Sequence, residues 1–348
     1  LFLTVLLLMA CGMESTFNGD TQLVPEVTGS KSFPYNPAVS ITTGVSASAV
    51  TVSADGRFVV AVNPDSDSIT VVDASTLSVL FEIPVGDNPR TVAITPDSTK
   101  ALVTNHGSEN LSKVDLVRGL EISRYDTGSM PYGVVTDGIH AFITEFGVGT
   151  VSAINLKNGE LVTRISVDPF PSGLALSRDG LSLLVTHFFT GKLTVINQQK
   201  SIVNGTTSTG SNTNLSQFVA ISSDGMKAYL PQTRSNTTNT ALLFDTTVFP
   251  VINVVDLVNL QLLVKERITL DTADEPVNMP FSLALSPAGN TLYLANAGSD
   301  DVSVIDLKTN KGLAHLPVGS NPRGIAITPD GSRIFVNNVL DGTLSVID

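Results

Sequence analysis

The sequence predicts an all-β protein, a seven-bladed β-propeller with four antiparallel strands in each blade. Three observations support this prediction: a segment that recurs about every 42 residues, seven similar turns, and a composition rich in turn residues. The segment Gly86–Asp97 reads GDNPRTVAITPD, and Gly319–Asp330 reads GSNPRGIAITPD. Self-similarity at periods of roughly 20 to 50 residues is typical of repeat folds, and four short strands per period indicate a propeller blade.

The turn between the first two strands of each repeat is the most regular element. Asp-Gly between two apolar strands predicts a hairpin, because glycine adopts a positive φ without steric strain. Successive turns are 42, 40, 42, 45, 64 and 42 residues apart, which gives seven units. The turns are Asp55-Gly56, Asp97-Ser98, Asp137-Gly138, Asp179-Gly180, Asp224-Gly225, Ala288-Gly289 and Asp330-Gly331.

The first and third strands of each repeat also carry recurrent residues. A small residue near the middle of the first strand fits an innermost strand, where neighbouring blades converge; these residues are Ala93, Ala175, Ala220, Ala284 and Ala326. The third strand ends on Asp or Asn, whose short side chain bonds the backbone two residues further on and starts a turn. These are Asp73, Asp115, Asn155, Asn197, Asp256, Asp306 and Asp348. We interpret them as turn-forming residues rather than catalytic acids.

Several of these segments resemble the YVTN family of β-propeller repeats. The matching segments are Val103-Thr104-Asn105, Val302-Ser303-Val304-Ile305-Asp306, Gly319–Gly324 and Thr328-Pro329-Asp330-Gly331. The resemblance extends over residues 38–348 and implies the propeller fold. It implies little about function, because such repeats serve as binding scaffolds in proteins with very different roles.

The seventh repeat stops after its third strand, so that blade needs a fourth strand from elsewhere. We expect Ala38–Thr43, which reads AVSITT, to supply it and so close the ring with an N-terminal strand in the last blade. The fifth repeat carries an insertion of about 20 residues, Thr233–Pro250, and a Gly/Ser/Thr/Asn-rich stretch, Asn204–Asn214, precedes it. Their composition predicts loops.

The N-terminus predicts a lipid-anchored protein. Residues 1–10 read LFLTVLLLMA, which is too short to span a bilayer and matches the apolar core of a signal peptide. The run ends at Leu8-Met9-Ala10-Cys11, which resembles a bacterial lipobox, and Cys11 is the only cysteine in the chain. We therefore expect residues 1–10 to be a signal peptide, residues 11–37 a tether acylated at Cys11, and residues 38–348 the propeller. The expected location is the bacterial cell envelope, on the periplasmic side of the outer membrane or at the cell surface.

Charge and cysteine content limit the range of partners and cofactors. The formal net charge of −12, with no cluster of Lys and Arg, argues against nucleic-acid binding. With one cysteine there is no Cys-pair metal site and no c-type haem attachment. The four histidines, His106, His140, His187 and His315, fall in different repeats, so we expect no metal ligand set and assign them to surfaces or loops. We expect no cofactor, and a monomer.

The residues facing the channel mouth are the candidates for ligand binding. Two loop positions in each repeat lie on this face of a propeller. Residues at the start of the first strands are Ser48, Arg90, Tyr132, Ser172, Gln217, Phe281 and Arg323; residues at the end of the second strands are Asn63, Asn105, Glu145, His187, Gln232, Asn296 and Asn338. The members that break the pattern point to a polar site for an anionic or peptide-like ligand. We single out Arg90, Tyr132, Glu145, His187 and Arg323.

The sequence contains no catalytic motif such as Gly-x-Ser-x-Gly, a phosphate-binding loop or His-Glu-x-x-His. We assign no catalytic residue and expect a binding or interaction module for a protein or small-molecule ligand. Two alternatives stay open. The segment Gly319–Asp348 resembles propellers that precede a dihaem cytochrome c peroxidase-like domain, which would lie beyond this chain. A lactonase is the other alternative, with Glu145, His187, Arg90 and Arg323 as its candidate acidic and basic residues.

Overall fold

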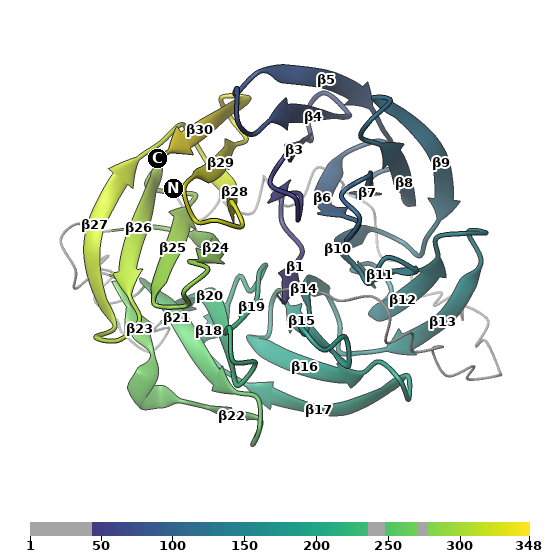
Figure 1. Cartoon of the computed structure of the whole chain (residues 1–348). Helices are drawn as coiled ribbons and strands as arrows, with labels where there is room; N and C mark the ends of the chain where they lie inside the picture. The colour runs from purple at the N-terminus through teal and green to yellow at the C-terminus, as the bar shows by residue number, and fades with distance from the viewer. Residues whose placement is uncertain (1–43, 236–247, 271–276) are drawn as a thin grey trace, which may run out of the picture. The chain divides into compact units, whose positions relative to one another are not determined.

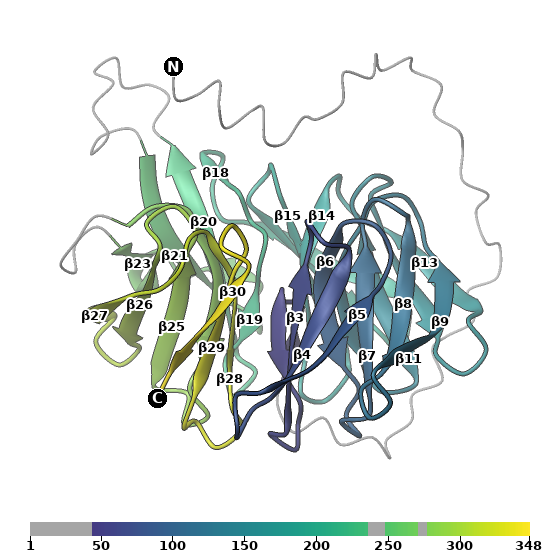
Figure 2. The ribbon, with the colours of Figure 1, turned by 90° about the horizontal axis from the view of Figure 1, so that it is seen from above.

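The computed structural model describes residues 44–235, 248–270 and 277–348. In these residues, seven antiparallel sheets surround one axis in chain order, as the sequence predicted (Figure 1). Seen edge-on, the strands run between two faces on which the connecting loops gather (Figure 2). The predicted signal peptide and tether, including Cys11, lie outside the described residues.

In each of the first four blades, four strands follow one another along the chain. They are β2 (Val50–Val52), β3 (Phe58–Asn63), β4 (Ser68–Asp73) and β5 (Val79–Pro84); β6 (Pro89–Ile94), β7 (Lys100–Asn105), β8 (Asn110–Asp115) and β9 (Leu120–Asp126); β10 (Pro131–Thr136), β11 (His140–Glu145), β12 (Thr150–Asn155) and β13 (Leu161–Ser166); β14 (Pro171–Leu176), β15 (Ser182–His187), β16 (Lys192–Asn197) and β17 (Ile202–Ser208).

The last three blades are less regular. Their strands are β18 (Thr213–Asn214), β19 (Ala220–Ile221), β20 (Lys227–Ser235), β21 (Val248–Asp256), β22 (Gln261–Leu262) and β23 (Ile268–Thr269); β24 (Pro280–Leu285), β25 (Thr291–Asn296), β26 (Asp301–Asp306) and β27 (Lys311–Pro317); β28 (Pro322–Ile327), β29 (Ile334–Asn338) and β30 (Thr343–Ile347). A single turn of 3₁₀ helix, Val264–Glu266, separates β22 from β23. Within the described ranges, no helix is long and apolar enough to cross a membrane.

The hydrophobic core lies between neighbouring blades. Buried side chains of blades three and four, such as Phe142, Val151, Leu174 and Leu183, form one cluster. Such sheet-on-sheet packing removes both faces of each inner strand from water. At the axis the strands approach closely, since a methyl group on Gly173 would lie 2.8 Å from the Gln217 carbonyl oxygen in the next blade.

Threonines of the second strands connect adjacent blades by hydrogen bonds. The Thr104 hydroxyl donates to the Tyr132 carbonyl oxygen at 2.6 Å. The equivalent bonds run from Thr144 to the Ser172 carbonyl and from Thr186 to the Ser216 carbonyl, both at 2.8 Å. In Val103-Thr104-Asn105 the threonine therefore stabilises the contact with the following blade.

The chain enters the propeller through the central channel. Strand β1 (Val45–Ser46) pairs with β14, the inner strand of the fourth blade. The Ala47 amide donates to the Leu174 carbonyl at 2.8 Å, and the Ser48 carbonyl accepts from the Val92 amide in the second blade at 2.9 Å. Ala47, Ser48 and Ala49 are buried. Residues 44–49 thus occupy the channel, which the sequence did not predict.

The ring closes between the seventh and first blades. The Asn337 side-chain amide donates to the Val62 carbonyl at 2.9 Å, and the Arg333 guanidinium donates to the Ala74 carbonyl at 2.7 Å. The described seventh blade has three strands, ordered β28-β29-β30. The segment predicted to add the fourth, Ala38–Thr43, lies outside the described residues. The residues that follow it run through the channel instead of along β30.

Two segments predicted as loops contain strands. Residues 204–208 of the stretch Asn204–Asn214 belong to β17, which pairs with the edge of β16, and the last two residues of the stretch form β18. At the insertion, β20 and β21 continue pairing as far as Ser235 and Val248. The prediction of a loop over Thr233–Pro250 is thus wrong at both ends, and residues 236–247 between them lie outside the described part.

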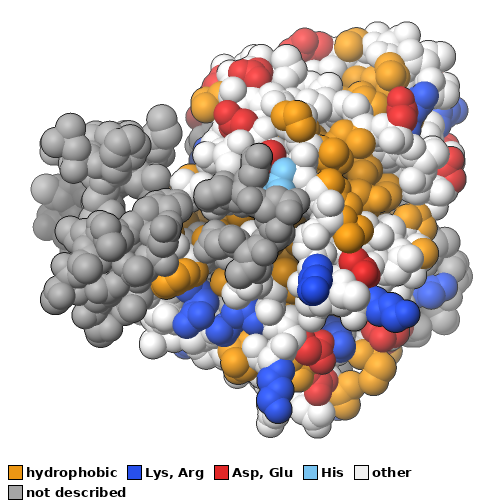
Figure 3. Space-filling view, turned by 90° about the vertical axis from the view of Figure 1, so that its left-hand side faces the viewer, with side chains coloured by type: hydrophobic (Ala, Val, Ile, Leu, Met, Phe, Trp, Pro, Cys, Tyr) orange, Lys and Arg blue, Asp and Glu red, His pale blue; other side chains and the backbone are white. Residues whose placement is uncertain are grey.

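The outer side of the propeller carries charges of both signs. Figure 3 shows acidic, basic and apolar side chains interspersed on one side of the molecule, with no extended basic area. On the side seen in Figure 3, neither sign of charge dominates.

The close contact at Gly173 yields a stability prediction. Gly173→Ala should lower the free energy of unfolding by about 1–3 kcal/mol, because the added methyl group meets the backbone of Gln217 and Phe218. Urea unfolding followed by circular dichroism would measure it. The control is Asn204→Ala on the exposed outer strand β17, expected to change stability by less than about 0.5 kcal/mol. Equal stabilities of the two variants would contradict the proposed crowding at the axis.

Candidate functional site

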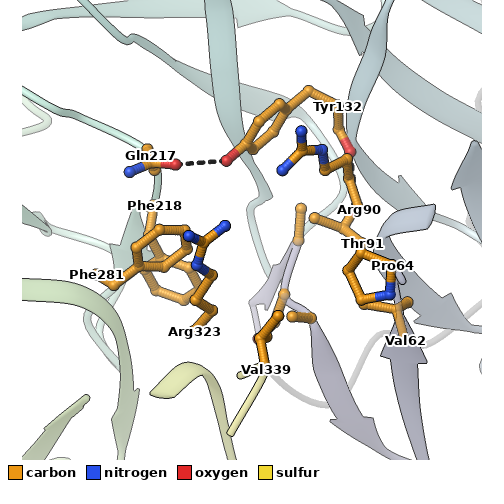
Figure 4. Close-up of a pocket in the computed structure, with 13 residues that line it drawn as sticks. Val62, Pro64, Arg90, Thr91, Tyr132, Gln217, Phe218, Phe281, Arg323 and Val339 are labelled. Atoms are coloured by element: carbon orange, nitrogen blue, oxygen red, sulfur yellow. Dashed lines mark hydrogen bonds between the residues drawn. The ribbon is translucent and has the colours of Figure 1, made fainter. Parts of the chain in front are cut away.

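A pocket opens at the channel mouth, where the inner strands begin. It encloses about 430 Å³ of space, part of it open to solvent. Its lining residues come from six of the seven blades and from the N-terminal segment (Figure 4). They are Ala47, Ser48, Ala49, Val62, Pro64, Arg90, Thr91, Tyr132, Gln217, Phe218, Phe281, Arg323 and Val339.

The inner-strand starts place the polar side chains of the pocket. Arg90, Tyr132 and Arg323 each follow the proline that begins β6, β10 or β28. Because these prolines occupy the same place in each blade, the next side chains converge on the mouth. Ser48 of the channel segment lies at the equivalent position in the first blade and contributes to the same lining. The pocket therefore brings together three of the five predicted site residues.

Two arginines share this pocket without a counter-ion. In the described ranges, neither Arg90 nor Arg323 forms an ion pair with a carboxylate. The Arg323 Nε donates to Asn321 Oδ1 at 2.6 Å, and its guanidinium carbon lies 5.6 Å from the Phe281 ring centroid. The guanidinium carbon of Arg90 lies 6.0 Å from the Tyr132 ring centroid, and the Arg90 Nε is buried without a hydrogen-bond partner.

The electrostatic effects in the pocket reflect these two like charges. Burial, together with the charge of Arg90, lowers the pKa of Arg323, while Tyr132 and exposed Asp65 act in the opposite direction. Burial raises the pKa of Tyr132, whose hydroxyl stays protonated and donates to Gln217 Oε1 at 2.6 Å. Burial and the nearby Arg90 also lower the pKa of His106 to about 4. The site is thus a positively charged, partly desolvated pocket with a neutral histidine beside it.

Glu145 does not line this pocket, contrary to our expectation. Its side chain is fully buried and accepts hydrogen bonds from the Gly128 amide at 2.7 Å and from the Thr150 hydroxyl. The Arg164 Nε lies 2.8 Å from its carboxylate. All its partners lie within the third blade or its entry loop, so the carboxylate stabilises that blade.

His187 has a similar structural place in the fourth blade. Its side chain is fully buried, with Nε2 2.9 Å from the Thr194 hydroxyl and Nδ1 3.3 Å from the Pro169 carbonyl oxygen. Burial lowers its pKa. The asparagines at the equivalent strand ends make the same type of contact; Asn105, for example, donates to the Ser112 hydroxyl at 2.8 Å. Side chains at this strand-end position form hydrogen bonds to the third strand of their own blade and do not face the channel.

The remaining histidines do not approach one another. His140 is buried beside Asp137 at 3.1 Å, and His315 lies 3.5 Å from Asp301. The prediction that the four histidines lie at surfaces or in loops is wrong for His140 and His187, which are buried strand residues. Across the three described stretches, no group of three or more His, Cys, Asp or Glu residues could hold a metal ion.

Four of the third-strand acids, Asp73, Asp115, Asp256 and Asp306, are turn-forming residues, as the sequence indicated. Asp73 accepts hydrogen bonds from the backbone amides of Ser75 and Thr76. The hydroxyl of Ser75 and these amides lower the pKa of Asp73 to about 2. At neutral pH such a carboxylate is ionised and occupied by its own turn.

An aromatic cluster on the same face was missed at the sequence level. We call Phe146, Phe170, Phe188 and Phe189 the aromatic rim. Phe146 and Phe188 directly follow β11 and β15, and Phe170 directly precedes β14, so all lie at the mouth end of the strands. The signal was available in the sequence, since Phe146 directly follows Glu145 and Phe188 directly follows His187.

Comparison with known proteins supports the propeller and leaves the activity open. A family model described as "Lactonase, 7-bladed beta-propeller" matches residues 21–118, under a third of the chain. The PE-PGRS family protein PE_PGRS18 of Mycobacterium tuberculosis is 42% identical over 52 residues, which cover 15% of this chain and 11% of that protein. The chain thus matches only about a tenth of this curated relative.

Two solved structures share the fold. Hydrazine synthase of Kuenenia stuttgartiensis superimposes with a TM-score of 0.80 at 22% identity, over 86% of this chain and 94% of the other. The Cps50 (Swd1) β-propeller domain of Myceliophteria thermophila gives a TM-score of 0.67 at 12% identity, over 88% and 99%. At these identities the similarity shows the architecture alone: the chain contains a seven-bladed β-propeller module.

The buried pair of Glu145 and Arg164 yields a second stability prediction. Glu145→Ala should lower the free energy of unfolding by at least about 2 kcal/mol, because it leaves the Gly128 amide and the Arg164 guanidinium without their acceptor. Glu121→Ala, which removes an exposed pair with Arg124, should cost less than about 1 kcal/mol. Urea unfolding of both variants tests this, and a Glu145 variant as stable as the Glu121 variant would refute a structural role.

Proposed function

We propose that this propeller is a binding module whose channel-mouth pocket holds a small anionic group between Arg90 and Arg323. The observation that carries the proposal is the pair of half-buried arginines in one pocket without a carboxylate partner. Two like charges in a partly desolvated site repel each other, and a bound anion relieves this repulsion. Guanidinium groups bind carboxylates through charge-assisted, often bidentate hydrogen bonds.

The other lining residues suit a planar anion such as a carboxylate. Tyr132 and Gln217 supply polar atoms on one side of the pocket, and Phe218, Phe281 and Val339 supply apolar walls (Figure 4). A few convergent polar groups in an otherwise apolar cavity are typical of small-molecule sites. Residues 47–49 lie in the channel beneath the mouth and make the site a pocket instead of a pore.

Lactone hydrolysis is the second candidate, favoured by the family model over residues 21–118. Against it, the residues that line the pocket include no Asp, Glu or His to serve as a general base. Hydrolysis of a lactone by the purified protein that disappears in Arg90→Gln would favour this function over binding alone.

We further propose that the module, whose repeats we assign to the YVTN type, is displayed on a bacterial cell envelope. The support is the sequence around Cys11 and the repeat motifs. In a bacterial host, Cys11→Ser should abolish incorporation of a fatty-acid label and release the protein from the membrane fraction. Labelling and fractionation unchanged by the substitution would overturn the anchor.

The arginine pair yields a binding prediction. Benzoate, a planar carboxylate, should bind the protein, and Arg90→Gln or Arg323→Gln should each weaken it at least about tenfold, because a hydrogen bond to a charged group contributes roughly 1.5–3 kcal/mol. Titration calorimetry measures the affinity. Arg178→Gln, an exposed arginine beside the Asp179-Gly180 turn on the opposite face, is the matched control.

His106 supplies an independent readout in the same titration. A bound carboxylate offsets the charge of Arg90, which contributes to the lowered pKa of His106, so that pKa should rise from about 4. Nuclear magnetic resonance of the imidazole reports it. Binding that is equally weakened by all three arginine variants, with no change at His106, would place the anion elsewhere.

A further inference from the structure

The aromatic rim and the arginine pocket form one continuous surface. Tyr132 joins them: its ring stacks on Phe146 with 6.1 Å between centroids, and the guanidinium carbon of Arg90 lies 6.0 Å from the centroid of the same ring. From Phe146 the rim continues to Phe170 at 5.2 Å, then to Phe189 at 5.0 Å and Phe188 at 4.7 Å from Phe189.

Two of the four rim side chains are exposed although they are apolar, and the other two are half-buried. Phe170 keeps 40% and Phe189 54% of its surface in contact with solvent. Next to them Met130, whose carbonyl accepts from the Phe146 amide, is 38% exposed. Exposed aromatic side chains that touch one another beside a polar pocket indicate an interaction site, because burying their apolar surface against a ligand is favourable in free energy.

We propose that this combined surface binds the C-terminal end of a partner polypeptide. Its terminal carboxylate occupies the space between Arg90 and Arg323, and the apolar side chains that precede it pack on Phe170 and Phe189. The inference deepens the proposed function and rests on it, since it names the ligand class of the same pocket.

Three features favour an extended chain over a compact small molecule. The pocket offers its two guanidinium groups to one charged group, whereas the rim, with Phe170 and Phe189 exposed, would leave a small ligand largely uncovered. The charged and apolar parts lie in series and are connected through Tyr132, which matches a carboxylate at the end of an apolar segment. The charge is also complementary, as two arginines face one end and none of the rim side chains is charged.

Recognition of a chain end depends on both parts of this surface. The carboxylate fixes the orientation through the arginines, and burial of apolar side chains on the rim contributes affinity. A polypeptide with an internal apolar segment lacks the carboxylate, so it should bind only weakly. The surface therefore selects termini.

The test uses two synthetic hexapeptide pools with Phe or Leu at the last two positions, one with a free C-terminal carboxylate and one with an amide. Passed over the immobilised full chain, the free-acid pool should be retained at least about tenfold more than the amide pool, as measured by mass spectrometry. Equal retention of the two pools, or no retention of either, would overturn the proposal.

Substitutions in the rim separate this proposal from the pocket proposal. Phe170→Ser with Phe189→Ser should reduce the affinity of the best retained free-acid peptide several-fold and leave benzoate affinity unchanged, because benzoate contacts only the pocket. Val258→Ser, an exposed valine in the β21–β22 turn, is the control. If benzoate binds but the rim substitutions leave the affinity of the peptide unchanged, the peptide proposal fails and the proposal of an anion pocket is retained. If Arg90→Gln and Arg323→Gln leave benzoate binding intact, both fail.

A second copy of the chain is the other occupant that the test distinguishes. Light scattering over a range of concentrations should show a monomer. If the protein is instead a dimer, and the double substitution Phe170→Ser with Phe189→Ser dissociates it, the rim serves self-association and the proposal is overturned.

Discussion

The convergence of seven inner strands around one axis is the constraint on which the rest of this structure depends. At Gly173 the inner strand of the fourth blade lies so close to the fifth blade that an added methyl group would lie 2.8 Å from the Gln217 carbonyl oxygen. Close approach in turn allows a threonine of one blade to reach a carbonyl of the next, as Thr104 reaches Tyr132. Buried hydrogen bonds of this kind satisfy polar groups that would otherwise be costly at the axis.

The same convergence separates the two repeated mouth positions into different roles. Side chains at the starts of the inner strands point toward the axis, so variation there changes the pocket. Those at the ends of the second strands lie one strand further out, where the third strand of the same blade offers a hydroxyl partner. Asn105 and His187 therefore both form a hydrogen bond to a hydroxyl of the third strand, although their side chains differ.

The N-terminal segment gives the ring its asymmetry. By pairing with β14 and bonding to Val92, residues 44–49 occupy the channel and connect the fourth and second blades, which are not neighbours in the ring. A repeat architecture with seven nearly equal blades would otherwise leave an open pore. The charged pocket exists at one end because the channel is filled beneath it, and the aromatic rim extends this site over the third and fourth blades only.

The sequence by itself determined the number of blades, their turns and the residues of the inner strands, because these depend on contacts within one repeat that recur at a regular period. It also predicted that Arg90, Tyr132 and Arg323 lie together at the channel mouth, since equivalent positions in the blades of a ring converge. Only the tertiary structure decided that Glu145 and His187 turn inward to their own blades, that residues 202–208 form a strand, and that the chain threads the channel. Each of these depends on which buried partner or free strand edge lies nearby in space. Such neighbours are set by the packing of whole blades, which no local pattern in the sequence records.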